Sequence, residues 1–173
     1  MISQIGGAAA PGFDDPLEML RACHGRIQSQ CSTLNKLLAH LPQHGCDTQA
    51  QQAARAILRY FDTAGRHHHD DEENDLLPLL LATSSGEAHA LVARLLAEHK
   101  IMDAAWQQLR ADLTRIADGT AASLDTTVTG QFIAAYDRHI AVENLQLLPL
   151  AATLLTTPQL ETLGKRMAAR RIS

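Results

Sequence analysis

Apolar residues recur at alternating steps of three and four along four long segments of the chain. Because an α-helix has 3.6 residues per turn, this spacing places them on one helical face. Turns containing proline, glycine or serine separate the segments, and helices joined by short turns become antiparallel neighbours. The pattern therefore predicts an all-α fold, an antiparallel up-down-up-down four-helix bundle. The inward face of the first segment is expected to contain Leu17, Leu20, His24, Ile27, Cys31, Leu34, Leu38 and Leu41.

Turn and capping residues indicate three parts of the chain. We expect residues 1–14 to form a flexible leader, residues 15–156 the bundle, and residues 157–173 a short C-terminal tail helix. Side chains of Asp, Ser and Thr favour helix starts, and proline favours the first helical position. The expected boundaries are Asp15-Pro16 at the start of the first helix, Pro42 at its end, Asp47 or Thr48 before the second, Thr83 to Gly86 after the second, Asp118-Gly119 after the third, and Ser123 before the fourth.

The composition narrows the class of protein. Hydrophobic residues make up 46% of the chain and aromatic residues only 3%, so we expect a core mainly of Leu, Ala, Ile and Val, of which alanine and leucine favour helices. The net charge of −4 and the lack of a Lys/Arg run argue against nucleic-acid binding. No apolar run is long enough to span a membrane, and no basic segment typical of a signal peptide is present. With three cysteines outside any CxxC pattern, we expect a reduced, cytoplasmic protein. The exposed tail helix is compatible with a monomer or a homodimer.

One histidine lies on the apolar face of each segment, and an internal repeat selects the same four residues. HHDDEENDLLP (68–78) and HIAVENLQLLP (139–149) both read His-x3-Glu-x5-Pro. His24 and His99 each lie on the helix that precedes one copy. The chain therefore resembles two copies of one helical hairpin. From the run HHHDDEEN, the repeat selects His68 and Glu72, and it predicts that the neighbouring residues His67, His69, Asp70, Asp71 and Glu73 flank them and face solvent.

The repeated histidines and glutamates have the chemistry of metal ligands. Residues four apart share one helical face, so each His and Glu pair points to the same point on the bundle axis. A buried carboxylate without a partner is costly, and no Lys or Arg lies on the inward faces to neutralise it. Imidazole suits iron, zinc, copper and nickel, and a carboxylate can bridge two ions. A site with two metal ions fits these donors best. The alternatives are hydrogen-bonded core histidines and a solvated polar face.

The segments "RACHGRI", "HHHDDEENDLLP", "AEHKIM" and "RHIAVENLQLLP" together resemble the hemerythrin-like, or HHE cation-binding, domain family over about residues 15–155. The resemblance implies two iron ions in a non-haem di-iron centre with an oxo or hydroxo bridge. It further implies that the metal ligands are His24, His68, Glu72, His99, His139 and Glu143.

Two departures from the oxygen carriers of this family refine the implied function. Those proteins have His-x3-His in the third helix, whereas Asp103 follows His99 at that spacing here, and they have a wider His and Asp spacing in the fourth helix. The chain is more similar to the bacterial branch that reacts with nitric oxide, peroxide or oxygen. The resemblance implies a protein that binds or reacts with such a small ligand in sensing, detoxification or iron handling, rather than a dedicated enzyme.

Several alternatives remain open from the sequence. A di-iron oxidase or oxygenase is one, although the Glu-x-x-His motif of the ferritin-like type does not occur, and a single-metal iron or zinc protein is another. Asp103 is a candidate seventh ligand. Tyr136, three residues before His139, is expected to pack with its hydroxyl at the surface, the alternative being a hydroxyl that faces the metal cavity.

Overall fold

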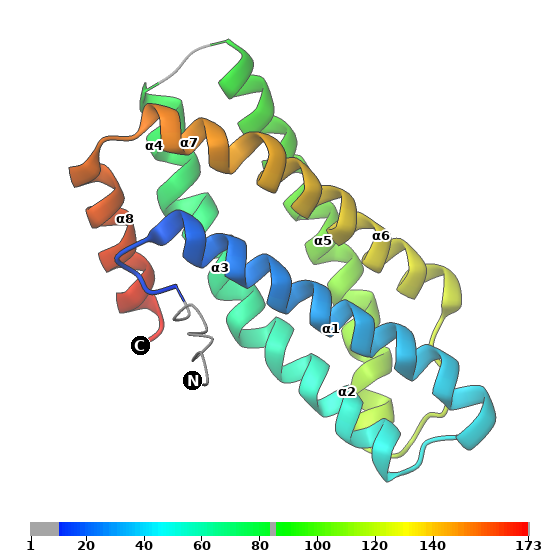
Figure 1. Ribbon diagram of the computed structural model, residues 1–173. Helices are drawn as coiled ribbons and strands as arrows, with labels where there is room; N and C mark the ends of the chain where they lie inside the picture. The colour runs from blue at the N-terminus through cyan, green and yellow to red at the C-terminus, as the bar shows by residue number, and fades with distance from the viewer. Residues whose placement is uncertain (1–10, 84–85, 173) are drawn as a thin grey trace, which may run out of the picture.

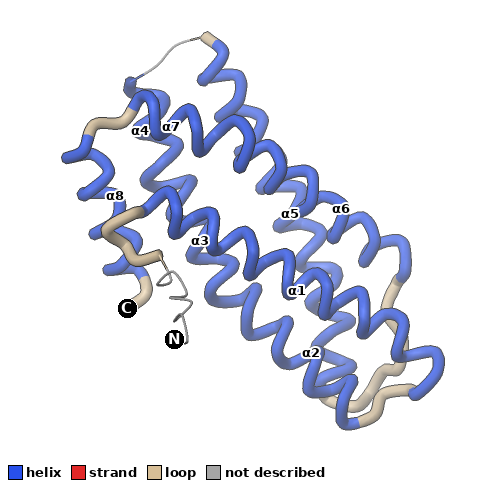
Figure 2. The backbone as a smooth tube through the Cα atoms, in the orientation of Figure 1, coloured by secondary structure: helices blue, strands red, loops and turns tan. Residues whose placement is uncertain are grey.

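The computed structural model describes residues 11–83 and 86–172, and within these residues helices are the only regular elements (Figure 1). Figure 2 shows how short the loops between them are. Most of the predicted leader, residues 1–10, lies outside the described residues. The helices are α1 (Pro16–His44), α2 (Thr48–Tyr60), α3 (Arg66–Asp71), α4 (Leu77–Thr83), α5 (Glu87–Ala117), α6 (Thr126–Val142), α7 (Leu148–Leu154) and α8 (Thr157–Arg170).

Short π-helical segments join several of these helices end to end. They are η1 (Phe61–Gly65) and η2 (Glu72–Leu76) between α2 and α4, and η3 (Glu143–Leu147) between α6 and α7. The chain therefore forms four long rods, in which α1 and α5 each pack against both the α2 rod and the α6 rod. This confirms the predicted four-helix bundle, and α8 is the predicted tail helix. Among the described residues, no helix combines the length and apolarity needed to cross a bilayer.

The helix ends follow from side-chain caps, with two differences from the prediction. Asp15 caps α1 by accepting a hydrogen bond from the Glu18 amide, as predicted. Pro42 does not end α1, which continues to His44, because Pro42 lies in the last turn with its ring exposed and lacks only one amide donor. The fourth rod begins at Thr126, capped by Asp125, and not directly after Ser123.

Asp47, not Thr48, is the cap of α2. Its Oδ1 atom accepts a hydrogen bond of 2.8 Å from the Ala50 amide and also lies 3.0 Å from His40 Nε2. We expect Asp47→Ala to lower the free energy of unfolding by about 1 kcal/mol, the usual loss for a helix cap. Urea unfolding measures the change, and Thr48→Ala is the matched control. A larger loss in Thr48→Ala than in Asp47→Ala would show that the cap is misassigned.

The π-helical segments change which residues face the bundle interior. A π-helical turn closes its hydrogen bond five residues along, so steps of four residues remain on one face there. Uninterrupted α-helical steps would predict that Ala64, Leu79 and Gln146 face inward, but Ala64 and Gln146 are exposed and Leu79 is half-buried. The buried series instead reads His68, Glu72, Leu76 and Leu80 in one rod and His139, Glu143, Leu147 and Ala151 in the other.

A polar layer divides the apolar interior of the bundle into two clusters. Along α1, Leu20 belongs to one cluster and Ile27 to the other, and His24 lies between them. The same order occurs along α5, where His99 separates the two clusters. Apolar packing above and below thus keeps the four predicted histidines away from solvent and at the same depth.

Candidate metal centre

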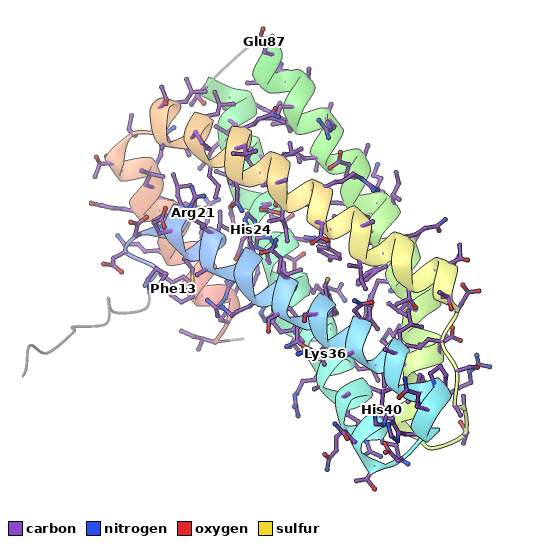
Figure 3. The ribbon with its side chains drawn as sticks, turned by 45° about the vertical axis from the view of Figure 1, so that its right-hand side comes forward. Phe13, Arg21, His24, Lys36, His40 and Glu87 are labelled. Atoms are coloured by element: carbon purple, nitrogen blue, oxygen red, sulfur yellow. The ribbon has the colours of Figure 1, made fainter. Side chains whose placement is uncertain are left out.

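The structure brings all six predicted residues together in the polar layer. Each is at most 1% exposed. Figure 3 shows His24 on α1 with its side chain among those between the helices. The imidazoles come from four different rods, and the two glutamates are the first residues of η2 and η3. The six residues are His24, His68, Glu72, His99, His139 and Glu143.

Their side-chain atoms form two overlapping groups of potential ligands. Within each group, one ligand atom per residue lies within 4.8 Å of all the others. Both groups contain Glu72 and Glu143. We name the group that adds His24 and His68 the His24 position, and the group that adds His99 and His139 the His99 position. The arrangement is that of two neighbouring cation positions that share two carboxylates.

Each glutamate turns one oxygen toward each position. Glu72 Oε1 lies 3.4 Å from His68 Nε2, and Glu72 Oε2 lies 3.3 Å from His99 Nε2. Glu143 Oε2 lies 3.0 Å from His24 Nε2, and Glu143 Oε1 lies 2.9 Å from His139 Nε2. The two carboxylates therefore have the orientation that bridging between two ions requires, and they come from equivalent places in the two sequence repeats.

The unpaired polar atoms in this layer fit bound cations. Both oxygens of Glu72 and both oxygens of Glu143 are buried, and none accepts a hydrogen bond of good geometry within the described residues. No Lys or Arg of the described residues pairs with either carboxylate. A buried acceptor left unsatisfied costs about 1–3 kcal/mol, and more when it is charged. Two cations would satisfy all four oxygens.

The electrostatics of the layer also favour positive charge. Burial by itself lowers the pKa of His24, but the nearby Glu143 and Glu72 carboxylates reverse this effect and raise its pKa to about 10. Burial is likewise outweighed at His99, whose pKa the glutamates raise to about 9. At His68 burial dominates and lowers the pKa to about 4. Although burial acts to raise the pKa of Glu72, His68, His24 and His99 hold it well below its ordinary range.

Outer hydrogen bonds hold three of the four imidazoles by Nδ1 and leave Nε2 directed at the glutamates. The Nδ1 atoms of His99, His139 and His24 lie 2.7 Å from Glu73 Oε1, Glu98 Oε2 and Asn144 Oδ1, respectively. Such partners fix the orientation of a metal-binding imidazole. The sequence prediction missed these three roles. Each partner is the immediate sequence neighbour of a predicted ligand. Helical periodicity alone does not reveal this adjacency.

Two residues predicted to face solvent are buried. His69 is 8% exposed, and its ring stacks on His99 with 4.1 Å between ring centroids. The π-helical segment η1 accounts for this, because its extra residue rotates His69 toward the interior. Asp71 is fully buried because α8 covers it, and Arg170 and Arg171 pair with its carboxylate. Glu73 is accessible as predicted, but it also contacts His99.

Tyr136 and Asp103 take places beside the site and not in it. Tyr136 is 4% exposed, and its hydroxyl lies 3.5 Å from His69 Nε2, so the prediction of a surface hydroxyl is wrong. Asp103 belongs to neither group of potential ligands; its side chain is 70% exposed and lies 3.9 Å from His69 Nδ1. Both residues line a cavity of about 680 Å³ that also reaches His69 and Glu73. The cavity therefore reaches the two residues, His69 and Glu73, that contact the His99 ring.

Comparisons with known proteins identify similar sequences. The sequence profile described as "Hemerythrin HHE cation binding domain" matches residues 15–151. A protein of Haemophilus influenzae described as uncharacterized is 32% identical over 159 residues, which cover 92% of this chain and 91% of that protein. The matched range contains all six residues of the polar layer and all four long rods except the last three residues of α7.

Proposed function

The chain belongs to the hemerythrin HHE cation-binding family, and on that premise we propose that its polar layer holds two iron ions and binds or reacts with oxygen, nitric oxide or peroxide. One observation carries the proposal. Two buried carboxylates each turn one oxygen toward each of two imidazole pairs, and these oxygens lack hydrogen-bond partners within the described residues. Imidazole and carboxylate together suit iron, and shared carboxylates suit a pair of ions.

The roles of the residues follow from their positions. His24 and His68 would hold one iron, His99 and His139 the other, and Glu72 and Glu143 would lie between the two ions. Iron in such a site supplies redox chemistry and an attachment point for a small ligand. The side chains themselves are at most 1% exposed, so the surrounding packing admits small ligands and excludes large substrates. The cavity beside His69 and Tyr136 is the proposed approach. A role in sensing, detoxification or iron handling follows more readily than turnover of an organic substrate.

Anaerobic loading with Fe(II) tests the proposal. At equilibrium with excess free Fe(II), we expect two bound iron ions per chain, a near-ultraviolet charge-transfer band after oxidation, and a spectral change on titration with nitric oxide. Metal analysis and absorbance measure these results. A preparation that retains at most one iron under these conditions would rule out the two-iron proposal and leave a single-metal protein.

Neighbouring histidines in the HHHDDEEN run provide a second prediction. His68→Ala removes a donor from the His24 position alone, so we expect it to lose one of the two iron ions. His69→Ala removes a buried ring that contacts His99 but belongs to neither position, so we expect it to retain two. Iron analysis of the two variants, prepared side by side, gives the answer. Equal losses in both would show that His69 also acts as a ligand.

A further inference from the structure

The two cation positions differ in what holds the outer nitrogens of their imidazoles. At the His99 position, both Nδ1 atoms face carboxylates, because His99 lies 2.7 Å from Glu73 Oε1 and His139 lies 2.7 Å from Glu98 Oε2. At the His24 position, His24 Nδ1 faces the neutral amide oxygen of Asn144 at 2.7 Å. The Nδ1 atom of His68 is buried and has no hydrogen-bond partner within the described residues.

This difference acts on metal affinity in two ways. A carboxylate that accepts the Nδ1 proton makes the imidazole a more basic ligand and fixes its orientation. It also adds negative charge near the ion. Glu98 is itself held in place, since Arg94 Nε donates to its Oε1 atom at 2.7 Å. The His99 position has two such carboxylates, whereas the His24 position has one amide and one imidazole without an outer partner.

We infer that the two positions bind iron with unequal affinity, tightly at the His99 position and exchangeably at the His24 position, and that Glu73, Glu98 and Asn144 set the difference. This inference rests on the proposed two-iron function. It assigns these three side chains a positioning role, because each acts on the metal through a histidine. It also makes the His24 position the one that gains or loses iron as the supply changes.

A competition titration tests the inference. Protein freed of metal is titrated anaerobically with Fe(II) in the presence of a coloured chelator, which gives two stepwise dissociation constants. We expect the two constants of the unmodified protein to differ at least tenfold. The double variant Glu73→Gln and Glu98→Gln keeps the shape of both side chains and removes their charge. It should weaken the tight step about 10- to 100-fold, the usual effect of removing an outer partner, and leave the weak step nearly unchanged.

Further variants assign the steps to positions. Asn144→Asp supplies the missing carboxylate at the His24 position, so it should strengthen the weak step. His68→Ala should abolish the weak step and keep the tight one, and His139→Ala should abolish the tight one. Glu161→Gln, an exposed change on α8, is the control for the loss of one negative charge. Glu98→Gln alone replaces the double variant if circular dichroism shows that the latter does not fold.

The possible outcomes separate the inference from the function on which it rests. Two equal constants, or equal weakening of both steps by the glutamine variants, would overturn the inference while two ions still bind. Binding of fewer than two ions by the unmodified protein would overturn the proposed function and the inference with it.

Discussion

Glu72→Ala is expected to prevent stable binding of both iron ions. Glu72 belongs to both cation positions and turns one oxygen toward each. Its loss leaves three protein donors at each position and a single carboxylate, Glu143, to neutralise two divalent ions. Charge neutralisation within a buried site is a large energetic term, because an unpaired charge there is strongly disfavoured. Both positions should therefore weaken together, in contrast to the loss of one ion expected for His68→Ala.

The measurement is the iron bound per chain at equilibrium with a fixed concentration of free Fe(II) under anaerobic conditions. We expect less than one ion per chain for Glu72→Ala at an iron concentration that supplies two to the unmodified protein. Glu161→Ala controls for the removal of one exposed carboxylate, and helical circular dichroism controls for folding. Retention of one tightly bound ion by Glu72→Ala would contradict a shared carboxylate and would favour two independent sites.

The features that the sequence predicts well are those repeated along the chain. The spacing of apolar residues on the helices that contain His24 and His99 predicts the bundle. The His-x3-Glu repeat selects residues that lie in the polar layer. Each of these signals involves neighbours within a few turns of one helix, so periodicity alone is enough to find them. Their role as metal ligands remains a proposal, which iron analysis of the variants tests.

The π-helical segments were missed although a local signal for them exists. In both repeats the inward residues follow in three steps of four, as in His68, Glu72, Leu76 and Leu80. Four α-helical residues turn through about 400°, so three such steps drift about 120° from the starting face. Residues that remain inward despite this drift require a wider turn. The π-helical segments that begin at Glu72 and Glu143 provide it.

The burial of Asp71 has no comparable local signal, because it depends on a helix about 100 residues later in the chain. α8 also contacts η2, the segment that begins at Glu72. Figure 1 shows α8 beside α3 and the start of α1, and Figure 3 labels Phe13 near the C-terminal helix. Arg171 lies over the Phe13 ring at 5.2 Å, which joins the tail helix to the segment before α1.

Arg170, the last residue of α8, and Arg171, which follows it, are therefore expected to contribute strongly to stability. Asp71 is fully buried and pairs with Arg170 and Arg171, with 2.6 Å between Arg171 Nη2 and Asp71 Oδ2. Replacing both arginines by methionine keeps most of the apolar contact of their stems but leaves a buried carboxylate without a partner. Removing one partner of a buried ion pair lowers the free energy of unfolding by about 3–5 kcal/mol. We expect a loss near the lower end of this range, because the two arginine side chains remain 21% and 23% exposed.

Urea unfolding of the metal-free protein measures this loss, and two further variants identify its cause. Arg166 also pairs with Asp75, but the Arg166 side chain is 61% exposed. Arg166→Met should therefore lower the free energy of unfolding by less than about 1 kcal/mol. Asp71→Asn, added to the double methionine variant, removes the unpaired charge and should restore part of the lost stability. If it restored none, the loss would come from packing of the tail helix and not from the buried charge of Asp71.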